Sequence, residues 1–384
     1  MRPPFDSEHL DALMEEAGID LVIATSKHNV RYLLGTHSFF SGHFEAIGVD
    51  RFLPIVGYRR ARSNDAFAVW SEMERSQHEV EPFWVQTPIT RCQTSLEATA
   101  ALVDQVHELS LGSGTLAVEH SFLPASALAA LQRSLPQATL VEAGPILDEL
   151  RAVKTAGELR LLRQASEAIV ESLETAARSV GVGSTTREIA ELVRIEETVR
   201  GLNFEYLLAA TGPSFNRVPS GARWEEGAVL SLDSGGEKHG YIGDLCRMAV
   251  LGEPTPRMED LLGQVRSIQA AARQPIRAGA IGVEIYEAAF AEVARCNDRE
   301  LVGFVAHGMG LVSHEAPRLT DSGPIRYPAT HRHLPLRAGM VISIETEVRA
   351  PGIGLIKLED TVVVTEDGHE AYGDAARDWI RVPA

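Results

Sequence analysis

A segment in the second half of the chain, VLSLDSGGEKHGYIGDLCR (residues 229–247), carries two runs of alternating side chains on either side of a glycine-containing stretch. This pattern is typical of an antiparallel β-hairpin, in which successive side chains point to opposite faces. If the turn centres on Lys238 and His239, Asp233 and Asp244 lie directly opposite each other, with Cβ atoms about 5 Å apart. Two carboxylates that close repel each other, so the pattern predicts a cation between them.

A second hairpin pattern, MVISIETEVRAPGIGLIKLEDTVVV (residues 340–364), repeats this arrangement near the end of the chain. Pairing about Gly352 places Glu345 opposite Glu359. Glu347 shares a strand face with Glu345 and, from the pattern alone, is an alternative ligand. The two hairpins together predict a cluster of buried acidic side chains.

Between the hairpins lies FVAHGMGLVSHEAPRL, in which His307 and His314 stand beside glycines that allow close backbone approach. Four carboxylates and one imidazole form an oxygen-rich ligand set that suits two divalent ions such as Mn, Co, Fe or Zn. Two such ions lower the pKa of a bridging water and polarise a carbonyl, as hydrolysis requires. The residues therefore predict a dinuclear metal-dependent hydrolase.

The length and the order of patterns predict two domains. A chain of 384 residues is too long to form a single compact core. Residues 1–150 alternate helical and strand patterns, which favours an α/β layer domain. Residues 151–384 open with helical stretches at 156–180 and 185–200 and continue with strands and hairpins, an α+β order.

Charge and cysteine content limit the partners and the compartment. The formal net charge is −17 and no stretch concentrates Lys and Arg, so nucleic acid and anionic membranes would repel this surface. The three cysteines are widely spaced and form no CxxC pair, which favours a reducing cytoplasm. No apolar run approaches the roughly 18 residues of a membrane-spanning helix. We expect a soluble cytoplasmic protein without an export signal that acts on a small molecule.

The two hairpins and the segment HGMGLVSHE resemble those of the pita-bread metallohydrolases, the group that contains prolidase, aminopeptidase P, methionine aminopeptidase and creatinase. The segment EEAGIDLVIATSKHNVRYLLG is similar to the start of the creatinase-type N-terminal domain. LDELRAVKTAGELRLLRQASE is similar to the segment that opens the pita-bread domain. The resemblance covers nearly the whole chain. It implies a creatinase-type α/β domain over residues 1–150, followed by a pita-bread catalytic domain over residues 151–384.

The resemblance also implies roles for individual residues, and it chooses Glu345 over Glu347. The implied ligands of the two divalent ions, with manganese as the first expectation and Co, Zn or Fe as alternatives, are Asp233, Asp244, His307, Glu345 and Glu359. His314 would contact the substrate and assist proton transfer, and Glu345 would also shuttle a proton. A homodimer is implied, with the N-terminal domain of one subunit shaping the pocket of the other.

Several residues depart from the pattern of the Xaa-Pro peptidases. Their substrate-contacting histidine falls on Asn216 when the segments are counted back from Asp233 without gaps, or on Ser220 with a gap. Lys357 replaces an arginine, and a lysine cannot reproduce a bidentate guanidinium contact. The usual proline after Glu345 is missing. These departures predict an intact metal site and an altered substrate pocket.

Three functions are consistent with these residues. The first is hydrolysis of a C–N bond in small Xaa-Pro peptides, as in prolidase or aminopeptidase P. The second is hydrolysis of a small non-peptide amide or amidine, as in creatinase and ectoine hydrolase. The third is a non-catalytic pita-bread binding protein, against which the complete ligand set argues.

Overall fold

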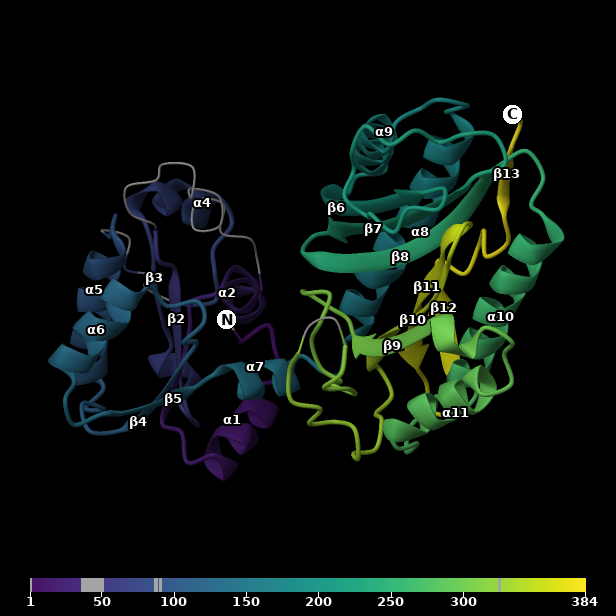
Figure 1. The fold of residues 1–384 in the computed structure, drawn as a ribbon. Coiled ribbons are helices and arrows are strands. Elements are labelled where there is room, and N and C mark those ends of the chain that lie inside the picture. Colours follow the sequence, from purple (N-terminus) through teal and green to yellow (C-terminus); the bar gives the residue numbers. More distant parts are fainter. Residues whose placement is uncertain (1, 36–51, 86–88, 90–91, 324–325) are drawn as a thin grey trace. The chain divides into compact units, whose positions relative to one another are not determined.

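The structure, a computed structural model, describes residues 2–35, 52–85, 89, 92–323 and 326–384. The chain divides into two compact units, Met1–Leu150 and Arg151–Ala384 (Figure 1). Among the described residues, no helix has both the length and the apolar character needed to span a bilayer.

The N-terminal unit is a five-stranded sheet between helices, in the strand order β3-β2-β1-β4-β5. β1 pairs in parallel with β4 and antiparallel with β2. Its side chains alternate between two apolar cores, Val22 with one and Ile23 with the other. The elements are α1 (Ser7–Glu16), β1 (Leu21–Ala24), α2 (Lys27–Leu34), β2 (Ile55–Arg59), η2 (Ser63–Asp65), β3 (Phe67–Val69), η3 (Glu72–Glu74), α4 (Arg75–Val80), α5 (Ser95–Glu108), β4 (Thr115–Val118), α6 (Ala125–Ser134), β5 (Thr139–Glu142) and α7 (Gly144–Leu150). This is the predicted α/β layer domain.

The C-terminal unit is built on an eight-stranded sheet whose main path runs β6-β7-β8-β11-β10-β9, with β12 beside β11 and β13 beside β8. Its elements are α8 (Ala156–Arg178), α9 (Thr186–Val199), β6 (Asn203–Thr211), β7 (Val229–Lys238), β8 (Tyr241–Leu251), α10 (Pro256–Arg273), α11 (Val283–Val293), η4 (Arg299–Leu301), β9 (Val302–Gly308), β10 (Val341–Ala350), β11 (Gly354–Val364), β12 (His369–Tyr372) and β13 (Ile380–Val382). The mixture of helices with antiparallel strands confirms the predicted α+β order.

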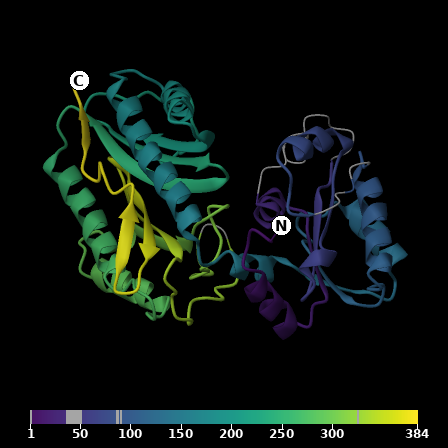
Figure 2. The ribbon, with the colours of Figure 1, turned by 180° about the vertical axis from the view of Figure 1, so that it is seen from behind.

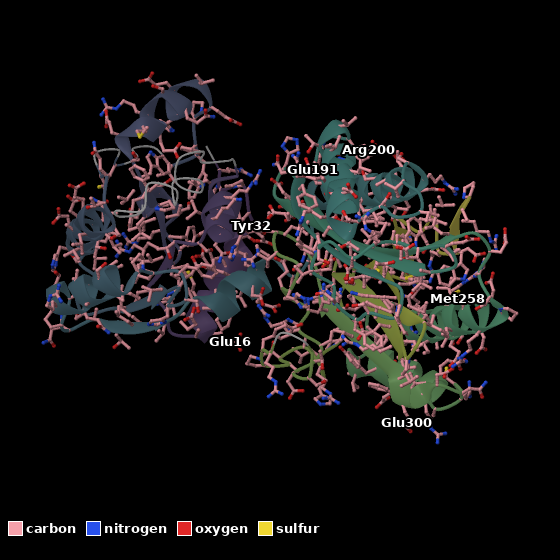
Figure 3. All side chains as sticks on the ribbon, turned by 45° about the horizontal axis from the view of Figure 1, so that its top comes forward. Glu16, Tyr32, Glu191, Arg200, Met258 and Glu300 are labelled. Atoms are coloured by element: carbon pink, nitrogen blue, oxygen red, sulfur yellow. The ribbon has the colours of Figure 1, made fainter. Side chains whose placement is uncertain are left out.

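Two pairs of helices pack on this curved sheet, α8 and α9 along β6 to β8, and α10 and α11 along β9 to β11 (Figures 1 and 2). α8 and α9 each begin at a capping box, formed by Thr155 with Glu158 and by Thr185 with Glu188. The outward face of α9 is charged, and its Glu191, labelled in Figure 3, forms an ion pair with Arg194. The helices therefore cover one face of the sheet and leave the other face for a site.

The turn between β7 and β8 differs from the prediction. His239 and Gly240 form a two-residue turn with φ angles of 49° and 87°, so Lys238 pairs with Tyr241. Tight hairpin turns favour positive φ at both central residues, a conformation that glycine adopts without strain. The register consequently places Asp233 opposite Cys246, and the predicted direct pairing of Asp233 with Asp244 is wrong. The displacement is two residues, so both aspartates keep the same face of the sheet.

The second hairpin has the predicted register. Ala350 pairs with Gly354 across the turn, and Glu345 lies opposite Glu359. The direct pairing of these two glutamates is confirmed.

Candidate metal centre

Strand register brings the five predicted ligands to the same face of the sheet. Across neighbouring strands, Asp233 lies opposite Cys246, which lies opposite Glu359, which lies opposite Glu345. On β9, His307 pairs with Ser343, two residues from Glu345. Residues that face each other across strands share a face, and so do residues two apart along one strand. The five side chains therefore converge from five adjacent strands.

Three of these side chains form a compact, buried group. Asp244, His307 and Glu359 each offer a ligand atom within 4.8 Å of the others. Within the described part of the chain, Asp244 Oδ1 and His307 Nε2 are buried without a hydrogen-bond partner. Such orphaned polar atoms are costly unless a ligand or ion satisfies them.

The spacing of this group also suits a shared ion. His307 Nε2 lies 3.6 Å from Oε1 of Glu345 and 3.6 Å from Oε1 of Glu359. That is long for a hydrogen bond, but donor atoms that each lie about 2.1 Å from one ion stand roughly 3 to 3.5 Å apart. Ser343 Oγ donates to Glu359 Oε1 at 2.8 Å and fixes that carboxylate. The donor set therefore fits a divalent ion.

The pKa shifts indicate an excess of negative charge at the cluster. Burial, followed by the charges of Glu359 and Asp233, raises the pKa of Asp244 well above its ordinary value. Burial lowers the pKa of His307, but the nearby carboxylates of Glu345, Glu359 and Asp244 raise it to about 9. A divalent cation among these groups would offset that negative charge.

The cluster also contains a lysine. Lys357 Nζ lies 2.7 Å from Asp233 Oδ2, 2.6 Å from Glu345 Oε2 and 2.8 Å from Glu359 Oε2. Burial alone would lower the pKa of Lys357, but these three carboxylates raise it well above its usual value. We predicted that Lys357 would affect the substrate pocket, whereas the structure places it among the predicted ligands. The signal was available in the sequence, because Lys357 stands two residues before Glu359 and so shares its face.

A second cation, Arg217, reaches the same cluster and was missed by the sequence analysis. Its guanidinium donates to Asp233 Oδ2. Arg217 lies on the loop between β6 and β7, where its carbonyl accepts a hydrogen bond from the Ala209 N–H. No periodic pattern marks this loop, so its neighbours could not be inferred from spacing.

Asn216, the predicted substrate contact, lies beside Arg217 but does not point into the cluster. Its side chain is exposed and donates to the Val218 carbonyl at 3.1 Å, while its Oδ1 accepts from the Val218 N–H at 3.3 Å. These bonds form a local turn on the loop. The residue at this point of the chain that reaches the cluster is Arg217.

His314 lies next to the ligand group. Its ring stacks on that of His307, with the centroids 3.9 Å apart. Its Nδ1 is 3.4 Å from the Tyr327 hydroxyl, and the guanidinium of Arg318 lies 4.6 Å from the centre of the Tyr327 ring. Burial, followed by the positive charge of His307, lowers the pKa of His314 to about 3, so its imidazole is neutral near pH 7. His314 is thus adjacent to the group without belonging to it.

Glu347, the alternative to Glu345, is paired elsewhere. Its Oε1 lies 2.8 Å from Arg349 Nε. Glu345 contacts both His307 and Lys357. The geometry therefore favours Glu345 as the member of the cluster.

Behind the cluster, the opposite face of the same strands is held by a buried arginine. Arg247 forms an ion pair with Asp360 at 2.8 Å and donates to the backbone carbonyls of Cys246 and Glu359. Asp360 also pairs with Arg273. Because Asp360 and Arg247 alternate with Glu359 and Cys246 along the strands, this network ties β8 to β11 on the side away from the candidate ligands.

Comparison with known proteins decides the family. Residues 160–366 match the model of metallopeptidase family M24, and residues 7–153 match the creatinase/prolidase N-terminal domain. The chain belongs to metallopeptidase family M24. It therefore combines a creatinase-type N-terminal domain with a pita-bread domain, as the sequence predicted, and is a metal-dependent hydrolase. Family M24 implies divalent metal ions, which the buried donor set fits.

Individual relatives match over nearly their whole length at low identity. The Xaa-Pro dipeptidase of Pyrococcus horikoshii is 24% identical over 375 residues, 96% of either chain. The uncharacterised peptidase YqhT of Bacillus subtilis is 24% identical over 97% of this chain and 99% of its own.

Solved structures of dipeptidases share the fold. An Xaa-Pro dipeptidase from Bacillus anthracis superposes with a TM-score of 0.82 at 22% identity, covering 98% of this chain and 99% of that one. Dipeptidase PepE from Mycobacterium ulcerans superposes with a TM-score of 0.78 at 24% identity, covering 99% of this chain and all of that one. At these identities the likeness shows the fold alone.

Proposed function

We propose that this M24 chain hydrolyses the C–N bond of small Xaa-Pro peptides with the help of a divalent ion, manganese being the first choice before Co, Zn or Fe. The observation that carries the proposal is the buried group of Asp244, His307 and Glu359, whose donor atoms fit an ion and include the orphaned Asp244 Oδ1 and His307 Nε2. The full-length similarity to Xaa-Pro dipeptidases supports a peptide substrate.

The residues around the ion suggest how hydrolysis proceeds. A bound divalent ion would lower the pKa of a water molecule and polarise the scissile carbonyl. Glu345 is the most accessible carboxylate of the cluster, with its side chain 16% exposed. Lys357 holds its Oε2, which leaves Oε1 to accept a proton from the attacking water and to pass it to the leaving nitrogen.

His314 is suited to hold the substrate. As a neutral imidazole it offers one N–H donor and one acceptor nitrogen. Stacking on His307 and the nearby Tyr327 hydroxyl fix the orientation of the ring. We assign His314 to substrate contact and proton transfer, beside the ion but outside its ligand set.

A small non-peptide amide or amidine is the second candidate substrate. It is favoured by the position of Asn216, which is exposed and bonded to its own loop where Xaa-Pro peptidases carry a substrate-contacting histidine. The side chain of Ser220, the other position considered, is also bonded to its own loop, because its Oγ accepts a hydrogen bond from the Ala222 N–H at 3.3 Å. Without that histidine, binding of an Xaa-Pro peptide loses one positioning contact.

A turnover screen distinguishes the two substrates. The Mn-loaded protein would be assayed on Xaa-Pro dipeptides, longer Xaa-Pro peptides, matched Xaa-Ala peptides, creatine and ectoine. We expect Xaa-Pro cleavage with kcat/KM below about 10⁴ M⁻¹ s⁻¹, the low end of ordinary enzymes. Cleavage confined to a non-peptide compound would replace the first function with the second.

We also propose a cytoplasmic homodimer. Three buried cysteines without disulfides support a reducing compartment, and the dimer rests on the family resemblance. A light-scattering mass near that of one chain, 41.7 kDa, at micromolar concentration would contradict the dimer.

A further inference from the structure

Asp233 differs from the other predicted ligands because two cations of the chain already pair with it. Lys357 Nζ and the Arg217 guanidinium both contact its Oδ2. The side chains of Lys357 and Asp233 are each 3% exposed. Within a buried pair of this kind, each partner offsets the desolvation of the other, and removing one is costly. The Oδ2 atom of Asp233 is therefore satisfied by protein groups.

Lys357 occupies the position between the carboxylates of Asp233, Glu345 and Glu359. An ion bound by Asp233 together with Glu345 and Glu359 would have to lie between these three carboxylates. The ammonium of Lys357 lies 2.6–2.8 Å from one oxygen of each of these three residues. An ammonium has three N–H donors, so three carboxylates use its full donor capacity.

The charge balance of the cluster also indicates room for one divalent ion. Metal binding requires deprotonated ligands. In that state His307 is neutral, Asp233, Asp244, Glu345 and Glu359 bring four negative charges to the cluster, and Lys357 and Arg217 bring two positive ones. The remaining two negative charges equal the charge of a single divalent ion. A second divalent ion would leave a net positive charge in a buried site, which is unfavourable.

The side of the cluster formed by Asp244 and His307 differs from the side at Asp233. Asp244 Oδ1 and His307 Nε2 are buried, and no hydrogen-bond partner is found for them in the described residues. Together with Glu359 they offer three ligand atoms within 4.8 Å of one another. Among the described residues, no Lys or Arg side chain pairs with Asp244 or His307, whereas two such side chains pair with Asp233.

We propose that this chain binds one divalent ion, on Asp244, His307 and Glu359 with Glu345 adjacent, and that the Lys357 ammonium, backed by Arg217, takes the second cation position. This inference rests on the proposed metal-dependent function. It departs from the two-ion, five-ligand expectation drawn from the sequence, because Asp233 here binds side-chain cations. The site then keeps one exchangeable metal and one covalently tethered positive charge.

Metal stoichiometry tests this proposal independently of activity. The purified protein would be stripped with chelator, reloaded with excess Mn²⁺, gel-filtered and measured by elemental analysis. We expect about one ion per wild-type chain, with the hyperfine spectrum of an isolated Mn²⁺ in electron paramagnetic resonance. Asp233→Asn should keep that ion, whereas Asp244→Asn should lose it.

Removing the lysine should open the second position. Lys357→Met keeps a long unbranched side chain without the charge, and we expect its metal content to rise above that of wild type. Lys27→Met is the matched control, because Lys27 is an exposed lysine of the N-terminal unit and its loss should leave stoichiometry unchanged. The comparison of wild type with Asp233→Asn does not depend on whether Lys357→Met folds.

Two results would overturn the inference while leaving the proposed function standing. One is a wild-type content of about two ions with a spin-coupled Mn²⁺ spectrum. The other is a loss of metal in Asp233→Asn as large as that in Asp244→Asn. A wild-type protein that takes up no divalent ion would instead refute the metal-dependent function and this inference together, so the two failures are distinguishable.

Discussion

The imidazole rings of His307 and His314 stack face to face, with a centroid separation of 3.9 Å and an interplanar angle of 19°. Only His307 belongs to the buried group of candidate ligands. The stack therefore joins the ring of a candidate metal ligand to the ring that we propose contacts the substrate. Their roles can be separated by measuring metal content and turnover in the same variants.

Replacing His314 should reduce turnover and leave the metal in place. We expect His314→Ala to lower kcat by roughly 10²-fold, the usual contribution of a general acid or base, with metal content within error of wild type. His333→Ala is the matched control, because His333 is an exposed histidine of the same unit. A parallel loss of metal and activity in His314→Ala would show that His314 acts as a ligand.

Two glutamates in neighbouring strands give a second matched pair. Glu359→Gln should abolish metal binding, because Glu359 belongs to the buried ligand group, while circular dichroism should show the fold largely intact. Glu347→Gln should keep full metal content, because Glu347 pairs with Arg349. Equal metal contents in the two variants would contradict the ligand assignment.

Glu197 on α9 should make stability depend on pH. Its side chain is fully buried, Ser234 Oγ donates to its Oε1 at 2.6 Å, and burial raises the pKa of Glu197 to about 8 from 4.5. Between these two values the folded state retains a proton that the unfolded state has lost. The free energy of unfolding contributed by Glu197 therefore falls as the pH rises through this window, by up to about 5 kcal/mol.

Urea denaturation at about pH 5 and about pH 8.5 checks this expectation. Glu197→Gln cannot ionise, so its loss of stability between the two pH values should be smaller than that of wild type by a few kcal/mol. Glu196→Gln serves as the control on the same helix, because the Glu196 carboxylate lies near the surface beside Arg200. Identical pH profiles for wild type and Glu197→Gln would show that Glu197 is ionised in the folded protein.

Strand periodicity was sufficient to predict which side chains share a face of the sheet. It was not sufficient to predict every pair of residues that lie opposite each other on neighbouring strands. The second hairpin was correct to the residue, with Glu345 opposite Glu359. In the first, the turn at His239 and Gly240 moved the pairing by two residues. The predicted sheet faces are still correct, because a shift of two residues keeps each side chain on the same face. The direct partners depend on which residues of the turn adopt positive φ.

The cations of the cluster show the limit of reasoning from spacing. Lys357 could have been placed, since it stands two residues from Glu359 on one strand. Arg217 could not, because it lies on a loop whose path is fixed by contacts such as the hydrogen bond from the Ala209 N–H to its carbonyl. The position of a loop residue depends on tertiary contacts, and these produce no regular spacing of side chains in the sequence.

The arginine network behind the cluster has a consequence for how the protein acquires its metal. Arg247 and Asp360 hold β8 against β11 without any contribution from an ion. We expect this network to hold the donor atoms in place with or without an ion, so that the ion can leave while the sheet stays folded. We therefore expect ions to exchange with the surrounding pool while the protein stays folded, so that the metal carried in a cell follows the local supply of each ion weighted by its intrinsic affinity for nitrogen and oxygen ligands.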